Sequence, residues 1–251
     1  MTTALMTAAL LTTALAACNT GPDTSTKLTA AEQLTVAKAK VNAATSIHLT
    51  LRSSGIPATA NGVLAADGSG THAPAFKGTL DARIAGFQVK VEVVAVNKVL
   101  YLKLPFTTDF VQADPKQYNA PDPAQLFAEQ GGISSLLTAT TNPAEGKKIR
   151  VGPDVVQTIT GTLPGTSVSK LLSVGDATKT FNVTYGITET GGELRTVTVT
   201  GPFYKGATTA ATSTPATSTP ATSTPATSTP ATSTYVLTLD KYGAPVEISK
   251  P

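Results

Sequence analysis

Three side chains of this chain stand out by their chemistry: the single cysteine, Cys18, and the two histidines, His48 and His72. His48 falls on a polar position of a predicted strand. No serine, cysteine or carboxylate lies at the spacing of a catalytic partner, so we expect a solvated surface imidazole rather than a base. His72 closes the glycine-rich turn Gly68-Ser69-Gly70-Thr71-His72. With no nucleophile elbow, metal-ligand cluster or phosphate-binding glycine loop, the sequence predicts no catalytic residue, no metal site, no cofactor and no enzymatic activity.

Cys18 ends a short apolar segment whose last residues, Leu15-Ala16-Ala17-Cys18, resemble a bacterial lipobox. In that motif the thiol receives a diacylglyceryl group and cleavage makes the cysteine the new N-terminus. We therefore predict a signal peptide at residues 1–17, a lipidated Cys18 and a protein anchored on the outer face of the cell membrane, within the cell envelope, with a partly secreted fraction. The alternatives are a buried thiol and a short transmembrane helix, although the segment is shorter than the ~20 apolar residues of a span. No Lys or Arg precedes the segment, which leaves the true start of the signal peptide open.

The charge and composition of the rest of the chain limit its partners and its organisation. The formal net charge is +3 and the Lys and Arg residues are scattered, so the chain has no electrostatic footprint for nucleic acid. One cysteine excludes an intramolecular disulfide framework. The polar residues 18–28 predict a lipidated tether. The length that follows suits one domain, which we place at residues 29–251.

The elements that would position a binding site begin with a predicted helix. Thr29-Ala30-Ala31-Glu32 has the spacing of a capping box. Small and apolar residues then recur with the helical period, at Ala30, Leu34, Ala37, Val41 and Ala44. This stripe predicts a helix that packs closely on a sheet.

From residue 46 onward, apolar and polar residues alternate as in strands with one buried face. Strands are predicted near residues 46–51 and 60–66, followed by an antiparallel meander over residues 76–104. The polar residues between the apolar positions, Arg83 among them, are expected on the hydrated opposite face. The side chains predicted to point inward are Ile47, Leu49, Leu51, Leu64, Leu80, Ala82, Ile84, Val89, Val91, Val93, Leu100, Leu102 and Leu104.

Prolines interrupt this pattern after residue 118, where two short helices are predicted over the concave face of the sheet. Their apolar residues are Leu126, Phe127, Ile133, Leu136 and Leu137. Gly131-Gly132 between them is either a hinge or a turn that ends a helix. Further strands are predicted near residues 148–151, 155–162, 178–187 and 193–204, with a short helix near 168–172. A final edge strand is expected after Gly243.

Residues 211–234 are five Ala-Thr-Ser-Thr units, four of them followed by proline. This composition cannot build a core, so we predict a disordered insertion at residues 207–234. The strands that flank it, ending at Tyr204 and starting at Tyr235, are expected to pair, because a long loop at a hairpin tip costs little stability. The many hydroxyls resemble mucin-like stalks. O-glycosylation is therefore a hypothesis, which an intact mass without added hexose would contradict.

Several short motifs together resemble the LppX/LprA/LprF/LprG family of mycobacterial and related actinobacterial lipoproteins. Besides the lipobox, they are Ser46-Ile47-His48-Leu49, Val96-Asn97-Lys98-Val99-Leu100-Tyr101, Asp122-Pro123, Gly131-Gly132-Ile133-Ser134-Ser135-Leu136-Leu137, Ile159-Thr160-Gly161 and Gly243-Ala244-Pro245-Val246. None of these motifs is specific alone, but they follow one another in the family's order over nearly the whole mature chain. The repeat insertion departs from the family pattern.

The resemblance implies an α+β fold, in which a strongly curved antiparallel sheet, or half-barrel, carries helices on its concave side that enclose an apolar cavity. It also implies a monomeric cell-envelope lipoprotein that binds acylated glycolipid or another long-chain lipid and assists its transport to the outer envelope. Its partners would be that lipid, the membrane through Cys18 and an envelope export partner, but no nucleic acid. Leu80 falls where the family has a pocket-lining residue. The lipid-binding cavity is then expected to be lined by Ile47, Leu49, Leu51, Leu64, Leu80, Ala82, Ile84, Val89, Val91, Val93, Leu100, Leu102, Phe127, Ile133, Leu136 and Leu137.

The alternating pattern by itself does not distinguish a hollow sheet from a filled one, because both need the same apolar face. The alternative function is a surface lipoprotein that acts by interaction, with a membrane sensor, wall polymers or host receptors, and carries no lipid. Lipid that co-purifies with the protein would distinguish the carrier from the interaction module.

Overall fold

The computed structural model describes residues 27–118, 120–204 and 232–251. These residues form an open antiparallel sheet of eleven strands in the order β6-β5-β4-β3-β2-β1-β11-β10-β9-β8-β7. The strands are β1 (Ser46–Ser54), β2 (Gly62–Thr71), β3 (Ala75–Ile84), β4 (Phe87–Val96), β5 (Val99–Lys103), β6 (Val111–Ala113), β7 (Thr141–Val151), β8 (Asp154–Pro164), β9 (Thr180–Thr188), β10 (Leu194–Gly201) and β11 (Ser233–Asp240). All neighbours in the sheet are consecutive in sequence except β1 and β11, whose pairing joins the two halves. The expected α+β half-barrel is confirmed.

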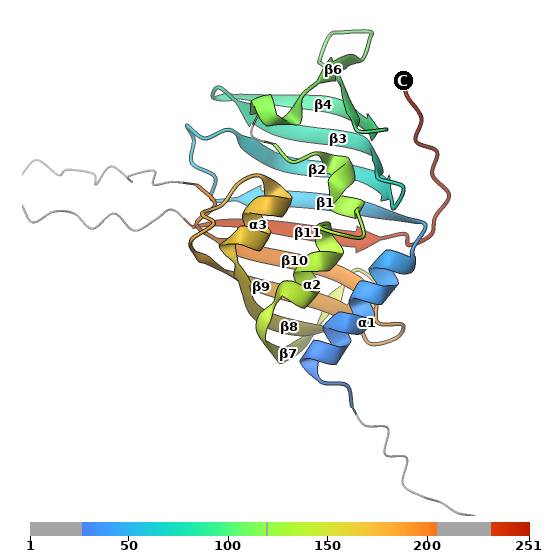
Figure 1. Cartoon of the computed structure of the whole chain (residues 1–251), viewed down its shortest axis with the longest axis vertical. Helices are drawn as coiled ribbons and strands as arrows, with labels where there is room; N and C mark the ends of the chain where they lie inside the picture. The colour runs from blue at the N-terminus through green and yellow to red at the C-terminus, as the bar shows by residue number, and fades with distance from the viewer. Residues whose placement is uncertain (1–26, 119, 205–231) are drawn as a thin grey trace, which may run out of the picture.

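Helical elements lie across one face of this sheet (Figure 1). They are α1 (Ala30–Ala43), the 3-10 helices η1 (Pro115–Tyr118) and η2 (Pro123–Phe127), α2 (Ile133–Ala139) and α3 (Gly165–Leu172). The two short helices predicted after residue 118 are η2 and α2, and their apolar side chains are buried as expected. Among residues 27–118, 120–204 and 232–251, no helix is both long and apolar enough to cross a bilayer.

The capping box predicted at Thr29 and Glu32 starts α1. The Thr29 hydroxyl accepts a hydrogen bond from the Glu32 backbone N–H (3.3 Å), and the Glu32 carboxylate accepts one from the Thr29 N–H (2.7 Å). The Thr29 N–H and the Thr29 hydroxyl (2.8 Å) both donate to the Glu32 carboxylate, and these hydrogen bonds lower the pKa of Glu32. The stabilisation by this carboxylate is therefore complete above the ordinary glutamate pKa and is lost as acidification protonates Glu32. Ala30, Leu34 and Ala37 of the predicted stripe are buried against the sheet and α2.

Thr29→Ala removes the side-chain acceptor of this cap. We expect the free energy of unfolding in urea to fall by about 1 kcal/mol, the usual effect of an N-cap threonine. Thr29→Ser retains the hydroxyl and serves as the control, with a smaller loss. Equal stability of Thr29→Ala and the unchanged protein would show that packing alone holds the start of α1.

The hairpin formed by β3 and β4 has the predicted register. Leu80 lies opposite Val91 and Ala82 lies opposite Val89, so the inward residues of β3 and β4 share one face. The strands flanking the repeat also pair as expected, with Val199 of β10 opposite Tyr235 of β11.

The helical cover of the two halves of the sheet is unequal. The three α-helices pack on the C-terminal half: α1 contacts β7 and β10, α2 contacts β8, and α3 contacts β8 and β9. The N-terminal strands β2, β3 and β4 are covered by η2, a single short 3-10 helix. A five-residue helix cannot fill the space that three α-helices fill on the other half. This difference in cover determines where the sheet is left incompletely packed.

Several strand predictions need correction at their ends. Leu104, predicted to point inward, lies beyond the end of β5 and is 46% exposed. β11 begins at Ser233, inside the predicted insertion, because the buried Ser233 hydroxyl donates to the Gly55 carbonyl and the strand continues in register with β1 and β10. The predicted final edge strand does not form: residues 241–251 contain no strand. The reason is that β11 already pairs on both sides and Pro245 lacks an N–H.

Some of the predicted features fall outside the described residues. They are the signal peptide at residues 1–17, the lipidated Cys18, most of the tether and residues 207–231 of the insertion. For these segments the sequence-based expectations stay predictions.

Candidate functional site

An apolar pocket lies between the N-terminal strands and the elements that cover them. Strands β1, β2 and β3 form one wall, and the segment leading into η2 and the end of α3 form the other. The lining residues are Leu49, Leu51, Gly62, Val63, Ala66, Phe76, Leu80, Ala82, Arg83, Ile84, Ala120, Pro121, Pro123, Leu126, Leu172, Val174, Tyr204 and Tyr235. Carbon atoms dominate this lining, so the pocket suits an apolar ligand.

The pocket is narrow in this conformation. Its volume is about 90 Å³. Pockets that bury a drug-sized ligand commonly measure ~300–1,000 Å³, so in this conformation the pocket is too small for a whole long alkyl chain.

Two stacked rings close the inner end of the pocket. Phe127 of η2 lies over Phe76 of β3 with ring centroids 6.2 Å apart and an angle of 20° between the planes. A Cβ at Gly70 would overlap the Phe127 ring, so a glycine is required at this position of β2 for η2 to approach the sheet. Removing that glycine would push the cover away from the sheet.

His72 contacts η2 at the same end of the pocket. Its Nδ1 lies 2.6 Å from the Phe127 carbonyl oxygen and its Nε2 lies 2.6 Å from the Val41 carbonyl oxygen at the end of α1. The prediction placed His72 in a turn, where it lies, but its ring connects two helical elements and is not simply part of that turn. This contact had no signal in the sequence because Val41 and Phe127 are distant in the chain.

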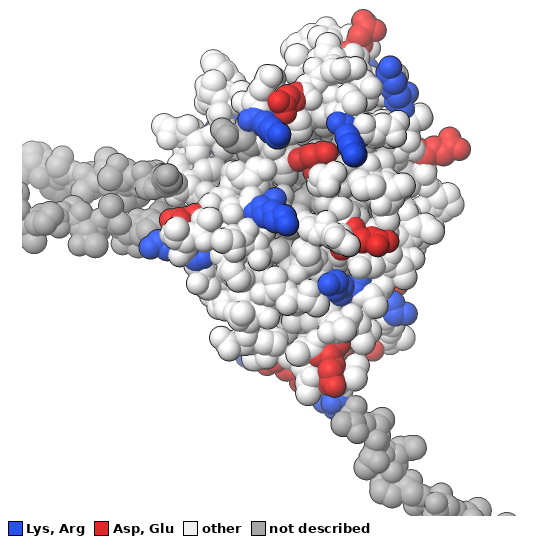
Figure 2. Space-filling view, in the orientation of Figure 1, with Lys and Arg blue, Asp and Glu red and all other residues white. Residues whose placement is uncertain are grey.

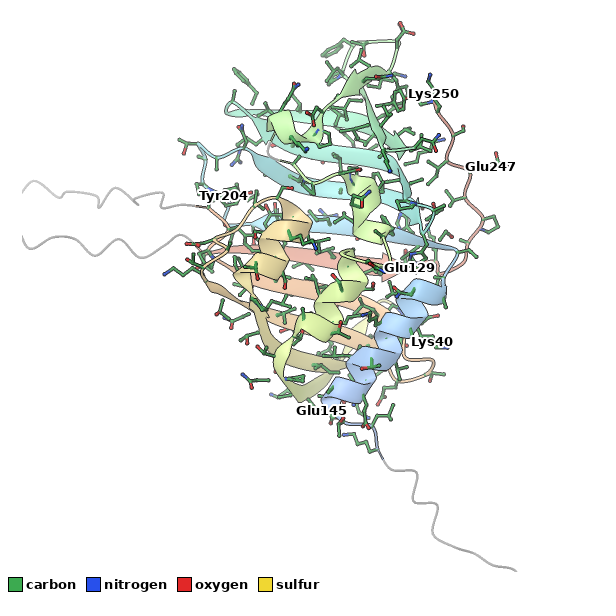
Figure 3. All side chains as sticks on the ribbon, viewed as in Figure 1. Lys40, Glu129, Glu145, Tyr204, Glu247 and Lys250 are labelled. Carbon is green, nitrogen blue, oxygen red and sulfur yellow. The ribbon has the colours of Figure 1, made fainter. Side chains whose placement is uncertain are left out.

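The outer end of the pocket carries the polar groups. Tyr204, labelled in Figure 3, follows β10. Tyr235 lies in β11, and the two hydroxyl oxygens are 2.6 Å apart. Burial raises the pKa of Tyr204, while its hydrogen bond with Tyr235 and the nearby Arg83 charge lower it. Burial also raises the pKa of Tyr235. Both hydroxyls therefore stay protonated and can act as donors at neutral pH.

A β-bulge changes which residues of β2 face the pocket. The register between β2 and β3 shifts between Val63 and Ala65, so Val63 and Ala66 line the pocket. The Ser53 hydroxyl donates to the Val63 and Leu64 carbonyl oxygens and holds this irregular segment. The prediction that Leu64 points inward is wrong, because one extra residue at a bulge reverses the alternation.

Only some of the sixteen predicted lining residues meet in this pocket. Leu49, Leu51, Leu80, Ala82 and Ile84 line it. Eight others are buried elsewhere in the core: Ile47, Val91, Val93, Leu100, Phe127, Ile133, Leu136 and Leu137. Val89 and Leu102 are partly buried against that core, and Leu64 belongs to neither group. The inward direction of these residues was predictable, but the extent of the open space was not.

Four lining residues from the covering elements were not among the predicted lining residues: Pro123, Leu126, Leu172 and Val174. Leu126 was expected on a helix over the concave face, but the other three had no such signal. Arg83 was expected on the hydrated opposite face, yet it is part of the lining at the outer end of β3. It lies opposite Gly62, next to the bulge, and a bulge increases the local twist of the strands.

The other histidine, His48, is not the solvated side chain that was predicted. Its side chain is 17% exposed, with Nδ1 2.6 Å from Asp240 and Nε2 3.3 Å from Asp67. These contacts connect β1 to both of its neighbours in the sheet, so His48 has a structural role.

Charges do not gather around this site. Figure 2 shows Lys, Arg, Asp and Glu scattered over the face that carries the helices. Within the described part of the chain, no group of three or more His, Cys, Asp or Glu side chains could hold a metal ion.

A curved open sheet, helices over its concave side and an apolar pocket between them define a half-barrel fold with an internal apolar site. The chain belongs to the LppX_LprAFG lipoprotein family, whose model matches residues 29–248. This confirms the resemblance inferred from the motifs.

Two solved structures share the fold. LprF from Mycobacterium bovis is 16% identical with a TM-score of 0.65, and the match covers 88% of this chain and 96% of that one. The lipoprotein LppX from Mycobacterium tuberculosis is 19% identical with a TM-score of 0.59, covering 88% and 98%. No protein with a curated description matches the sequence.

Proposed function

We propose that this protein is a membrane-anchored cell-envelope lipoprotein that binds an acylated glycolipid or another long-chain lipid and assists its transport to the outer envelope. The observation that carries the proposal is the apolar pocket of β1, β2 and β3, left under an incomplete cover on a fold shared with other lipoproteins. The tail of the lipid would occupy the pocket, and its headgroup would stay near Tyr204.

The pocket has the length of a lipid tail. Its lining on β3 runs from Phe76 to Ile84, which at ~3.3 Å per residue is roughly 25 Å. One leaflet of a bilayer core is about 15 Å thick, half of the ~30 Å of the whole core. The lining is therefore long enough for an extended acyl chain along the strand direction, while its volume is not large enough.

The free energy of tail burial is sufficient without a polar anchor. Each buried methylene contributes ~0.8 kcal/mol, so a sixteen-carbon chain gains roughly 12 kcal/mol before the costs of association and ordering. Broad selectivity among tails is the expected consequence, because an apolar wall does not distinguish one methylene chain from another.

The pocket must widen to hold a whole tail, and η2 is the element that can move. This short helix contacts the sheet through few residues. The Phe127 ring stacks on Phe76, and the His72 ring contacts the Phe127 carbonyl oxygen. Gly131, with φ +81° and no atoms near a Cβ position, follows η2, whereas a Cβ at Gly132 would overlap the Ala128 carbonyl oxygen. The diglycine thus forms a tight turn before α2. Its action as a hinge is part of the proposal.

Extraction of the purified protein with organic solvent, followed by mass spectrometry, tests the proposal. Glycolipid or long-chain lipid in stoichiometric amount is the expected result. A protein that purifies empty and takes up no lipid from vesicles would contradict the carrier function. That result would favour a surface lipoprotein that acts on a membrane sensor or another partner, and the narrow pocket would then be a packing defect.

Cys18→Ala tests the anchor separately from the pocket. We expect the variant to move from the membrane fraction to the soluble fraction, because the thiol that would carry the diacylglyceryl group is gone. Its bound lipid should be unchanged. Fractionation followed by immunoblotting measures the first effect, and retention in the membrane would point to an uncleaved apolar segment instead.

A further inference from the structure

Arg83 is the one charged residue among those that line the pocket. The side chain is half-buried at the outer end of β3. A guanidinium is permanently charged and has five N–H donors in a fixed planar arrangement. Its presence in an otherwise apolar lining requires an explanation.

Arg83 has no carboxylate partner within the described ranges. None of the ion pairs among those residues includes it, and the one hydrogen bond of its guanidinium donates from Nη1 to the Pro57 carbonyl oxygen at 3.2 Å. Most of its donors and its whole charge therefore stay available. The neighbouring acidic strand residue Asp81 makes none of these ion pairs either.

The tyrosine pair adds a donor beside this charge. The hydrogen bond between the Tyr204 and Tyr235 hydroxyls uses one of their two protons, which leaves the other to donate to a ligand. A Cβ at Gly62, the residue opposite Arg83, would overlap the Tyr204 hydroxyl. The glycine allows Tyr204 to lie against the strand pair that carries Arg83.

We propose that Arg83, with the Tyr204 hydroxyl, binds a negatively charged oxygen group in the headgroup of the lipid, so that the pocket prefers acidic lipids to neutral ones. This inference rests on the proposed function and names the class of lipid. The tail lies along β3 toward Phe76, and the phosphodiester or carboxylate lies at the outer end, where guanidinium and hydroxyl groups replace water. Phosphodiester and carboxylate share this chemistry, and the experiment separates them.

The test uses the full chain, freed of lipid, and displacement of a fluorescent long-chain alcohol from the pocket. The competitors are oleic acid, phosphatidylglycerol and the neutral dioleoylglycerol. We expect at least one acidic lipid to bind about tenfold or more tightly than dioleoylglycerol, the usual effect of one charge-assisted hydrogen bond. The tighter of the two acidic lipids identifies the headgroup.

Arg83→Gln should reduce binding of the acidic lipid by about tenfold and leave dioleoylglycerol unchanged. Arg83→Lys keeps the charge but not the planar donors, so it should restore part of the preference. Arg52→Gln on β1, which removes the same charge from a residue outside the pocket lining, is the matched control and should bind like the unchanged protein. Thermal unfolding verifies that each variant is folded.

Two results would overturn the inference in distinguishable ways. Equal binding of acidic and neutral lipids, with no effect of Arg83→Gln, would refute the headgroup preference and leave the lipid pocket in place. Failure of the fluorescent alcohol and of every lipid to bind would refute the proposed function together with the inference.

Discussion

Leu80→Trp is expected to abolish lipid binding while the protein stays folded. Leu80 lies in the middle of β3, between Ala66 and Val91 on the neighbouring strands, and lines the pocket. An indole at this position would extend into unfilled space, which is the condition under which added volume is tolerated. We expect lipid binding to fall below detection in the displacement assay and the free energy of unfolding to change by less than about 1 kcal/mol.

Val93→Trp is the matched control for this prediction. Val93 lies on the same inward face, in β4, but is fully buried and does not line the pocket. The same indole has no space there, so overpacking should cost about 1–3 kcal/mol or more. If Leu80→Trp destabilised the protein as much as Val93→Trp, Leu80 would be ordinary core and the pocket would have no role in binding.

Phe181→Ala is expected to have the largest effect on stability. Phe181 is fully buried in β9, in the half of the sheet under the three α-helices. Its ring meets Phe203 edge to face with centroids 4.8 Å apart, and Phe203 meets Tyr235 in the same way at 4.6 Å. Truncation to alanine leaves a cavity that this close-packed half cannot collapse to fill. The free energy of unfolding in urea should fall by about 3–5 kcal/mol.

Phe87→Ala is the control for Phe181→Ala: it removes the same side chain from a position that is 75% exposed and should change the free energy of unfolding by less than about 0.5 kcal/mol.

Phe181→Ala should also affect lipid binding, through the contacts of its ring. Because Phe203 connects Phe181 to Tyr235, the loss of the ring should also loosen the outer end of the pocket and weaken lipid binding. A loss below about 1 kcal/mol would mean that this half of the protein is not the filled core that the structure shows.

The two variants together distinguish the two halves of one sheet. Both halves have the same alternation of apolar and polar residues, as at Leu80 and Ala82 in β3 and at Phe181 and Val183 in β9. The two halves differ only in the helices that pack against them. A pattern of period two predicts which face of a strand is buried, but it does not predict the volume of the elements that pack against that face.

The sequence by itself determined the local features whose causes are local. The capping box of α1, the register of the β3–β4 hairpin and the pairing of β10 with β11 around the repeat all follow from neighbouring residues and turn chemistry. The short helices between Pro123 and Ala139 were likewise predictable, since prolines interrupt the strand pattern there. The motifs also placed the chain in its family before any three-dimensional comparison.

The tertiary structure decided what depends on contacts between distant segments. The bulge at Val63 and Ala65 displaced Leu64 from the inward face, and the single short helix over β2, β3 and β4 left room for the pocket. The tertiary structure also brought Arg83, Tyr204 and Tyr235 to the outer end of that pocket, although more than a hundred residues separate Arg83 from the tyrosines. The physical reason is that packing volume and charge pairing are properties of surfaces that meet only after folding, whereas periodicity is a property of one strand.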